Sequence, residues 1–263
     1  MSILEALIIG IVQGITEFLP VSSSGHILLL QRLFGIEYNL FTFSIVVHVG
    51  SLIPIFVVYF SRLKSLLFRP FQKLTWLLVL AMIPIVVVTV LIGDWVDTLF
   101  SGDFLAVGFI LTAVSMLLVD RALAGSKIEE DLTPKDALIV GAAQVMAIVP
   151  GVSRSGSTIF GGMLVGLDRQ SAANFSFLLA IPAILGGTVL EIFEFLGNDD
   201  ELTDFLLTTP VVVGFFASMI AGFFAIKLML KLIVDAKMKY FAYYLFVVAG
   251  LIVFDQLVTN FVF

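Results

Sequence analysis

The stretch Pro20-Val-Ser-Ser-Ser-Gly25 interrupts an apolar segment, residues 1–34, that is otherwise long enough to cross a bilayer. Pro and Gly end helices, and serine hydroxyls cap the helix that follows. Irregular backbone at membrane depth is tolerated only where it is buried in protein or lines a wet cavity. We therefore interpret residues 1–34 as a re-entrant helical hairpin whose serine-rich loop belongs to a site.

A second break of the same kind lies in the apolar segment 136–167, at Pro150-Gly-Val-Ser-Arg-Ser-Gly156. The two breaks share sequence: Val21 to Gly25 matches Val152 to Gly156, 131 residues later. Gly10-x-x-Gln13 matches Gly141-x-x-Gln144 at the same offset. The shared residues and the matching order of short and long apolar segments predict an internal repeat.

The composition is that of a membrane protein. Of 263 residues, 60% are hydrophobic and 13% charged, whereas soluble domains carry about 25% charged residues. The absence of cysteine excludes disulfides and thiolate sites. With two histidines, a multi-histidine metal site is improbable. The net charge of −6 argues against a nucleic-acid partner. Six apolar stretches are long enough to span: 41–60, 74–93, 104–119, 173–195, 209–230 and 240–258.

The positions of lysine and arginine predict the topology. An odd number of crossings in each half inverts the second half, and this inversion places twelve of the fourteen cations on one side, which the positive-inside rule makes cytoplasmic. Residues 61–73 are predicted to be a cationic loop, whereas the loops 94–103 and 196–208 carry only acidic charges. The predicted cytoplasmic cations are Arg62, Lys64, Arg69, Lys73, Arg121, Lys127, Lys135, Arg169, Lys227, Lys231, Lys237 and Lys239.

The predicted fold is an all-α polytopic membrane protein with inverted-topology repeats. It has six spanning helices and two re-entrant hairpins, hence ten helical segments. Residues 1–263 form a single membrane domain, with a first repeat at 1–123 and a second at 136–263. Both termini lie outside, no signal peptide precedes the first hairpin, and the two loops meet near mid-membrane. This architecture is also that of many secondary transporters.

The first loop carries groups for phosphate chemistry. Gln13 and Glu17 share one helix face, and an ionisable residue at this depth indicates function by default. The alternative is that Glu17 only caps the break or pairs with Arg154. Ser22, Ser23 and Ser24 at a helix start favour an anion site, although ordinary capping explains them too. His26 follows in the first turn.

The second loop adds Arg154, whose rigid fork suits phosphate oxygens. Two helix N-termini and one arginine indicate a phosphate-type anion site, beside groups able to bind a metal or transfer a proton. Mg²⁺ or Ca²⁺ is the expected metal class, because only oxygen ligands are available. His48 either lines the cavity or packs, and Ser176 is expected near the second hairpin. A transporter of an anionic lipid or solute is the rival hypothesis.

In these two motifs and over essentially its whole length, the chain resembles the bacitracin-resistance type undecaprenyl-diphosphatases. The signatures are Gln13-x-x-x-Glu17 followed by Phe-Leu-Pro-Val-Ser-Ser-Ser-Gly-His26, and Pro150-Gly-x-Ser-Arg-Ser-x-x-Thr158. Ala173-Asn-Phe-Ser-Phe-Leu-Leu-Ala-Ile-Pro182 also fits. The family allows Glu or Gln at the first position of the first signature. This chain has Gln13, whose amide cannot act as an acid, a base or a charged ligand.

The resemblance implies hydrolysis of undecaprenyl diphosphate to undecaprenyl phosphate and inorganic phosphate, which recycles the lipid carrier for peptidoglycan synthesis. It also implies a divalent cation, bacitracin resistance, and a site in the bacterial inner (cytoplasmic) membrane that opens to the extracytoplasmic side. Membrane lipid surrounds the protein, and the sequence leaves a homodimer open. Flipping of the prenyl-phosphate lipid is the alternative function.

Roles carried over from the family fall on both loops. Glu17 holds the metal or acts as base, and Ser23 is the favoured nucleophile. His26 is acid, base or nucleophile, and Arg154 stabilises developing charge. Whether a phosphoenzyme forms or activated water attacks directly stays open. The remaining residues expected at the substrate are Gln13, Ser22, Ser24, Gly25, Gly151, Ser153, Ser155 and Thr158.

Overall fold

The computed structural model describes the chain except residues 37–39, 100–101, 123–124, 196–207, 236 and 263, and except the side chains of 40–42, 93–99 and 190–195. In this described part the only β structure is one isolated bridge, between Lys127 and Leu167. The eleven described α-helices are α1 (Ile3–Phe18), α2 (Ser23–Phe34), α3 (Leu40–Val58), α4 (Phe60–Phe68), α5 (Lys73–Leu99), α6 (Leu105–Arg121), α7 (Pro134–Val145), α8 (Arg154–Leu164), α9 (Arg169–Phe195), α11 (Thr209–Val234) and α12 (Met238–Phe254).

Both predicted helix breaks are confirmed. The first falls between α1 and α2, and the second falls between α7 and α8, where a 3-10 turn (Met146–Ile148) extends the end of α7. All-helical architecture is confirmed as well. The prediction of ten helical segments is wrong, because the described residues alone form eleven.

The additional helix is α4, in a region predicted to be a loop. It follows α3 at an angle of 87°. A helix was not predicted here because the segment is rich in cationic residues, although large apolar side chains alternate with them. Phe60, Leu67 and Phe68 of α4 are strongly exposed, as expected for an amphipathic helix at a membrane surface.

Four described helices are long and apolar enough to cross a membrane, within α5, α9, α11 and the continuous α12 with its π turn (Asp255–Thr259). The bent pair of α3 and α4 raises this number to five. Six were predicted, and the remaining stretch, 104–119, forms α6 of only 17 residues. The chain is thus a multi-pass helical membrane protein.

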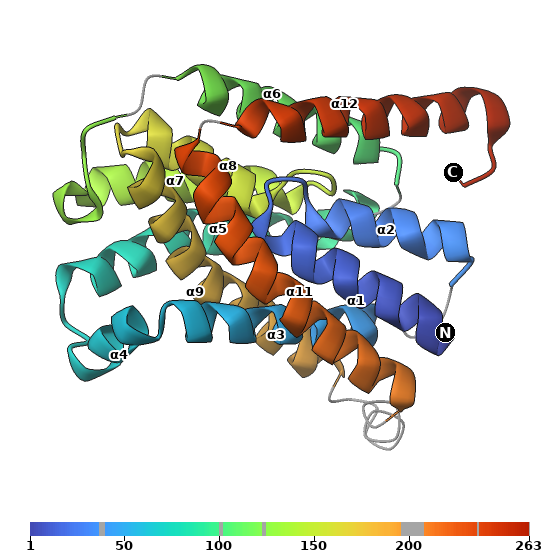
Figure 1. The fold of residues 1–263 in the computed structure, drawn as a ribbon, viewed down its shortest axis with the longest axis horizontal. Helices are drawn as coiled ribbons and strands as arrows, with labels where there is room; N and C mark the ends of the chain where they lie inside the picture. Colours follow the sequence, from blue (N-terminus) through green and yellow to red (C-terminus); the bar gives the residue numbers. More distant parts are fainter. Residues whose placement is uncertain (37–39, 100–101, 123–124, 196–207, 236, 263) are drawn as a thin grey trace.

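Glycines set the closest helix contacts. α1 crosses α11, and a Cβ at Gly10 would lie 2.4 Å from the carbonyl oxygen of Gly214. α7 crosses α5, and a Cβ at Gly141 would lie 2.2 Å from the carbonyl oxygen of Ala81. Small residues allow such close approach between helices in a membrane. α6 runs along α12 (Figure 1), and α3 packs against α11 in a further large contact.

The cationic connections gather at one end of the molecule. The Arg169 guanidinium donates to the carbonyl oxygens of Asp120 and Ala122, and the Lys239 backbone N–H donates to the Asp120 carboxylate. The Lys73 ammonium donates to the Glu130 carbonyl oxygen, which ties the start of α5 to the linker between the halves. In Figure 1, α4 lies at this end, and both chain termini lie at the other.

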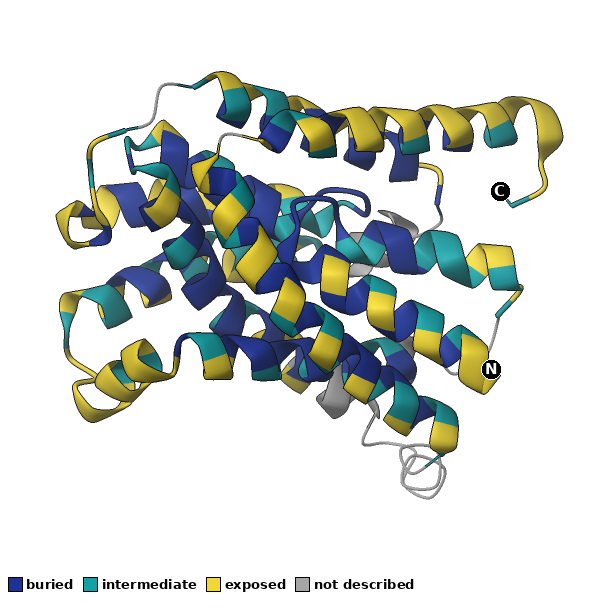
Figure 2. Cartoon of the chain, viewed as in Figure 1, coloured by how far each residue is buried: buried dark blue, intermediate teal, exposed yellow. Residues whose placement is uncertain are grey.

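The interior and the outer surface differ in the usual way for a membrane protein. Buried residues line the contacts around α1, α8 and α9, while the outer faces of α4 and α12 are exposed (Figure 2). Phe18, Phe109, Phe175 and Phe177 are fully buried and pack around the two breaks. Phe109 packs directly against the first loop, since a Cβ on Gly25 would lie 2.7 Å from its ring.

Candidate active site

The first break is a tight reversal between two short helices. Leu19 has extended backbone geometry after the last turn of α1, and Pro20 cannot continue the helix. Ser22 adopts φ +70°, a left-handed conformation that is unusual for a residue with a side chain. Its Oγ accepts from the Gly25 N–H at 3.3 Å. Ser22 is therefore the N-cap of α2, as predicted, and α2 begins with Ser23.

The second break has relaxed geometry at its cap. Gly151 takes the left-handed position, with φ +88°, and a Cβ there would lie 2.5 Å from the carbonyl oxygen of Leu105. Ser153, the N-cap of α8, has φ −76°, and its Oγ accepts from the Gly156 N–H at 3.1 Å. Thr112 of α6 holds this loop from outside, because its hydroxyl donates to the Gly151 carbonyl and accepts from the Ser153 N–H, each at 2.9 Å.

The two breaks meet at the carboxylate of Glu17. Its Oε1 accepts a hydrogen bond from the Arg154 guanidinium. Its Oε2 accepts from the Ser23 hydroxyl at 2.6 Å and from the Gln13 amide at 3.1 Å. Residues far apart in sequence thus form one buried cluster with a hydroxyl, a carboxylate and a guanidinium in contact.

A cavity of about 250 Å³ opens beside this cluster. α3 and α9 complete its wall, with His48 and Thr188 among the polar residues. The Arg154 Nη1 is buried without a partner among the described residues. An unused cationic donor and two helix N-termini favour an anion in this cavity. The predicted residues that line it are Glu17, Ser23, Ser24, Ser153 and Arg154.

Several predicted substrate-binding residues pack behind the cavity. Gly25 fits against Gly151, since a Cβ on Gly25 would lie 2.9 Å from the Gly151 Cα. The Ser155 hydroxyl lies 3.1 Å from that of Ser153 and 3.4 Å from the Leu19 carbonyl oxygen. The cavity wall therefore does not include Gln13, Ser22, Gly25, Gly151 or Ser155.

Thr158 also lies behind the cavity wall. Its hydroxyl lies 2.6 Å from that of Ser176 in α9. Ser176 was expected near the second hairpin, and this contact confirms that expectation.

His26 lies on the far side of the first loop. Its Nδ1 is 2.7 Å from the Ser22 carbonyl oxygen, and its Nε2 is 2.7 Å from the Tyr244 hydroxyl. Phe109 packs edge-on against the imidazole ring. The ring is therefore enclosed, and it is not part of the cavity wall.

His48 is the histidine that reaches the cavity. Its Nε2 lies 3.7 Å from Glu17 Oε2, and its Nδ1 lies 2.7 Å from the Ser44 carbonyl oxygen one turn earlier. The sequence left its position open, because a single histidine in an apolar helix carries no motif. The contributions of Gly187 and Thr188 from α9 were missed, since neither belongs to a polar cluster in the sequence.

The oxygen atoms at the cluster fit a hard divalent cation shared with a phosphate. Glu17 is the one carboxylate, the Ser23 and Ser24 hydroxyls are adjacent, and the buried Gln13 Oε1 has no partner among the described residues. The described residues contain no group of three or more acidic, histidine or cysteine side chains. Mg²⁺ commonly binds through one or two carboxylates together with substrate phosphates. The donor set is of that kind.

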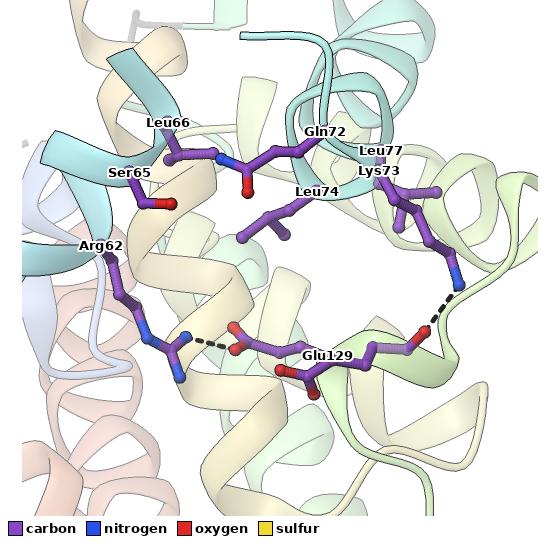
Figure 3. Close-up of a pocket in the computed structure, with 9 residues that line it drawn as sticks. Arg62, Ser65, Leu66, Gln72, Lys73, Leu74, Leu77 and Glu129 are labelled. Carbon is purple, nitrogen blue, oxygen red and sulfur yellow. Dashed lines mark hydrogen bonds and ion pairs between the residues drawn. The ribbon is translucent and has the colours of Figure 1, made fainter. Parts of the chain in front are cut away.

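A second and larger cavity, of about 370 Å³, lies between α4, the start of α5 and the linker (Figure 3). Arg62 pairs there with Glu129, and the Lys73 ammonium points to the linker backbone. Burial raises the pKa of the Glu129 carboxyl above its ordinary value, and the Arg62 charge offsets part of this rise. The Arg62 charge is thus paired with a carboxylate, and neither of the two serine-rich loops contributes to this cavity.

Comparison with known proteins identifies the family. The family described as "Bacitracin resistance protein BacA" matches residues 6–251. A protein of Carboxydothermus hydrogenoformans named undecaprenyl-diphosphatase is 42% identical over 94% of this chain and 95% of the relative. Relatives of the same name from Parabacteroides distasonis and Methanobrevibacter smithii are 41% and 38% identical, over 96% and 99% of this chain and 97% and 99% of their own lengths. The chain therefore belongs to the bacitracin resistance protein BacA family.

Proposed function

We propose that this protein hydrolyses undecaprenyl diphosphate to undecaprenyl phosphate and inorganic phosphate. The observation that carries the proposal is the meeting of Glu17, Ser23 and Arg154 at a cavity enclosed by helices of a membrane protein. The name shared by the relatives supplies the substrate. Phosphoryl transfer needs positioning and charge stabilisation above all, and the cluster offers both.

The chemistry begins with the terminal phosphate beside Arg154. The unpartnered Nη1 and the N-termini of α2 and α8 bind its oxygens and stabilise the charge that develops on them. The Ser23 hydroxyl already donates to Glu17 Oε2. As the Ser23 Oγ attacks the terminal phosphorus, Glu17 accepts its proton. The anhydride P–O bond breaks, and undecaprenyl phosphate leaves with that bond's electron pair.

Water completes the cycle. Glu17 first gives the proton it received to the departing undecaprenyl phosphate. Water then attacks the phosphoserine and gives a proton to Glu17, which passes it to the Ser23 Oγ as the bond between that oxygen and phosphorus breaks and inorganic phosphate leaves. In the competing route water attacks the diphosphate directly, and Ser23 only orients it. A bound Mg²⁺ or Ca²⁺ would neutralise phosphate charge, held by Glu17 with help from Gln13 and the loop hydroxyls. Ser22, Gly25, Gly151, Ser153, Ser155 and Thr158 shape the two loops that bind the substrate.

Our proposed topology places the cavity on the extracytoplasmic side of the bacterial inner membrane. It is supported by the gathering of the cationic connections at the end opposite both termini. The paired contacts of α1 with α11 and of α7 with α5 are those that two inverted repeats, 1–123 and 136–263, would make. In this topology both short hairpins are re-entrant, and six segments cross. Carrier recycling for peptidoglycan synthesis and bacitracin resistance follow from the activity.

The decisive experiment uses purified protein in detergent, which abolishes sidedness. Inorganic phosphate release from undecaprenyl diphosphate should require a divalent cation and be lost on chelation. The Ser23→Ala and Arg154→Ala variants should release almost none. Ser65→Ala, in exposed α4, is the matched control and should match wild type. Substrate binding without release in the wild-type protein would instead favour the lipid transporter.

A further inference from the structure

His26 is held by two hydrogen bonds that define its protonation. The Ser22 carbonyl oxygen can only accept, so the imidazole N–H is on Nδ1. In the neutral ring the other nitrogen, Nε2, is then an acceptor, and the Tyr244 phenol donates to it. Both ring nitrogens are used, and neither is left to exchange a proton with a phosphate in the cavity.

The bond to Ser22 acts on the residue with the unusual backbone. Ser22 is at φ +70°, a strained conformation for a residue with a side chain, which persists only where the surrounding structure holds it. The same carbonyl accepts from the His26 N–H and from His26 Nδ1. Ser23 follows directly, so the peptide orientation at Ser22 sets the direction in which the Ser23 hydroxyl leaves the loop.

Tyr244 connects this loop to α12. Its ring stacks on the imidazole with an interplanar angle of 12°, and its hydroxyl makes the bond to Nε2. α12 packs on α6, whose Thr112 holds the second loop through Gly151 and Ser153. Each loop therefore receives one hydrogen-bonding group from the paired helices α6 and α12.

We propose that Tyr244 and His26 are positioning residues, which hold Ser22 in its left-handed conformation and thereby aim Ser23 at the substrate. This inference rests on the proposed hydrolysis for its kinetic readout only. In this proposal His26 holds the loop in place and does not transfer a proton in the reaction. Tyr244 lies outside both loop motifs, so no sequence signature assigns it a role.

The kinetic test uses conservative variants. Tyr244→Phe keeps the stacked ring and loses one hydrogen bond, so kcat should fall about three- to tenfold with KM unchanged. Tyr243→Phe, on the same helix with a side chain 54% exposed, should leave both constants unchanged. His26→Asn keeps an N–H donor one turn after Ser22, and should retain at least about a tenth of the activity, whereas His26→Ala should lose about 100-fold. Equal and complete loss in His26→Asn and His26→Ala would show instead that His26 takes part in the chemistry.

The spectroscopic test does not depend on activity. The chain has two histidines, so the His48→Gln variant leaves His26 as the only imidazole in a ¹⁵N-histidine spectrum. We expect one protonated nitrogen, Nδ1, and a bare Nε2 whose signal shifts in Tyr244→Phe and does not shift in Tyr243→Phe. An unmoved signal together with wild-type kcat in Tyr244→Phe would overturn the inference. The expected signals in a protein that releases no phosphate would support the pair and reject the proposed hydrolysis.

Discussion

Two cavities in this molecule each contain an arginine–glutamate pair, and only one has the attributes of a site. Arg154 and Glu17 are 15% and 5% exposed, and Arg62 and Glu129 are 42% and 6% exposed. The cavity beside Arg62 is the larger, at about 370 Å³ against about 250 Å³. Cavity size and charge therefore do not separate the two.

The difference lies in what surrounds the carboxylate. Glu17 also accepts from a serine hydroxyl, and two helices begin at the same cavity. Glu129 bonds to Arg62 alone among the side chains, and its other oxygen has no partner in the described structure. A buried ion pair is weak evidence of function by itself. The pair is stronger evidence of a functional site when its carboxylate also accepts from a hydroxyl and two helices begin beside it.

Exchanging the arginine of each pair tests this comparison with the largest expected effect. Arg154→Ala should lower phosphate release by about 10³-fold or more, because a cation that stabilises transferring phosphate is lost. Arg62→Ala should leave turnover in detergent within about twofold, since it lies in the other cavity. Steady-state release of inorganic phosphate measures both. Similar losses in the two variants would remove the distinction between the cavities.

A double variant separates chemistry from folding in the first cavity. Arg154→Ala leaves Glu17 buried without its cation, which typically costs about 3–5 kcal/mol. Adding Glu17→Gln should restore much of the thermal stability, measured by tryptophan fluorescence, without restoring activity. Recovery of activity together with stability would mean that the pair is only structural.

The serines of the two cavities allow a second exchange. Ser23→Ala should reduce turnover by about 10³-fold if Ser23 is the nucleophile, and Ser65→Ala should not reduce it. A short incubation with substrate labelled in the terminal phosphate should label the wild-type protein and not Ser23→Ala. If Ser23→Ala retained high turnover, direct attack by water would replace the covalent route.

The pH dependence of stability distinguishes Glu129 by its raised pKa. The folded state then binds the proton more tightly than the unfolded state, so this contribution to stability is present at low pH. It is lost as pH rises from the ordinary value of 4.5 through the raised one. Arg62→Ala raises the pKa further and extends this loss toward neutral pH.

The measurement is the midpoint of thermal unfolding at about pH 5 and about pH 8. Arg62→Ala should lose about 1–2 kcal/mol more at the higher pH, less than a fully buried pair would, because Arg62 is 42% exposed. In Arg62→Ala/Glu129→Gln the difference between the two pH values should disappear. A difference that persisted would have to come from another group.

The smallest effect is expected at His48. Its Nε2 is 3.7 Å from Glu17, longer than a good hydrogen bond. His48→Gln keeps a polar side chain in the cavity wall and should lower kcat less than about tenfold. A loss as large as that of Ser23→Ala would make His48 a proton carrier in the reaction.

The sequence was most informative where a local rule applies. Pro20, Gly25 and the serines predicted the first helix break, and the matching residues predicted the second, because helix termination and capping depend on neighbours in the chain. The contact of Glu17 with Arg154 was foreseen as one alternative for Glu17. It could be foreseen because a charge buried in a membrane requires a partner.

The rest depends on packing that sequence spacing does not reveal. α4 was interpreted as a loop because its cations outweighed its apolar residues. The catalytic role expected for His26 stays a prediction, but its contact with Tyr244, 218 residues away, could not be read from the sequence. The α9 residues of the cavity wall carry no motif, and only the helix crossing brings them to the loops.

Glu17 lies in the first half of the chain and Arg154 in the second, and this division has a consequence for biosynthesis. Glu17 and Arg154 are 137 residues apart, so a ribosome delivers the guanidinium on the order of ten seconds after the carboxylate. During that interval Glu17 lacks the guanidinium with which it pairs in the folded protein. The nascent first half therefore lacks the cation that the proposed phosphate site requires, and hydrolysis of the diphosphate can begin only when the second half has been inserted.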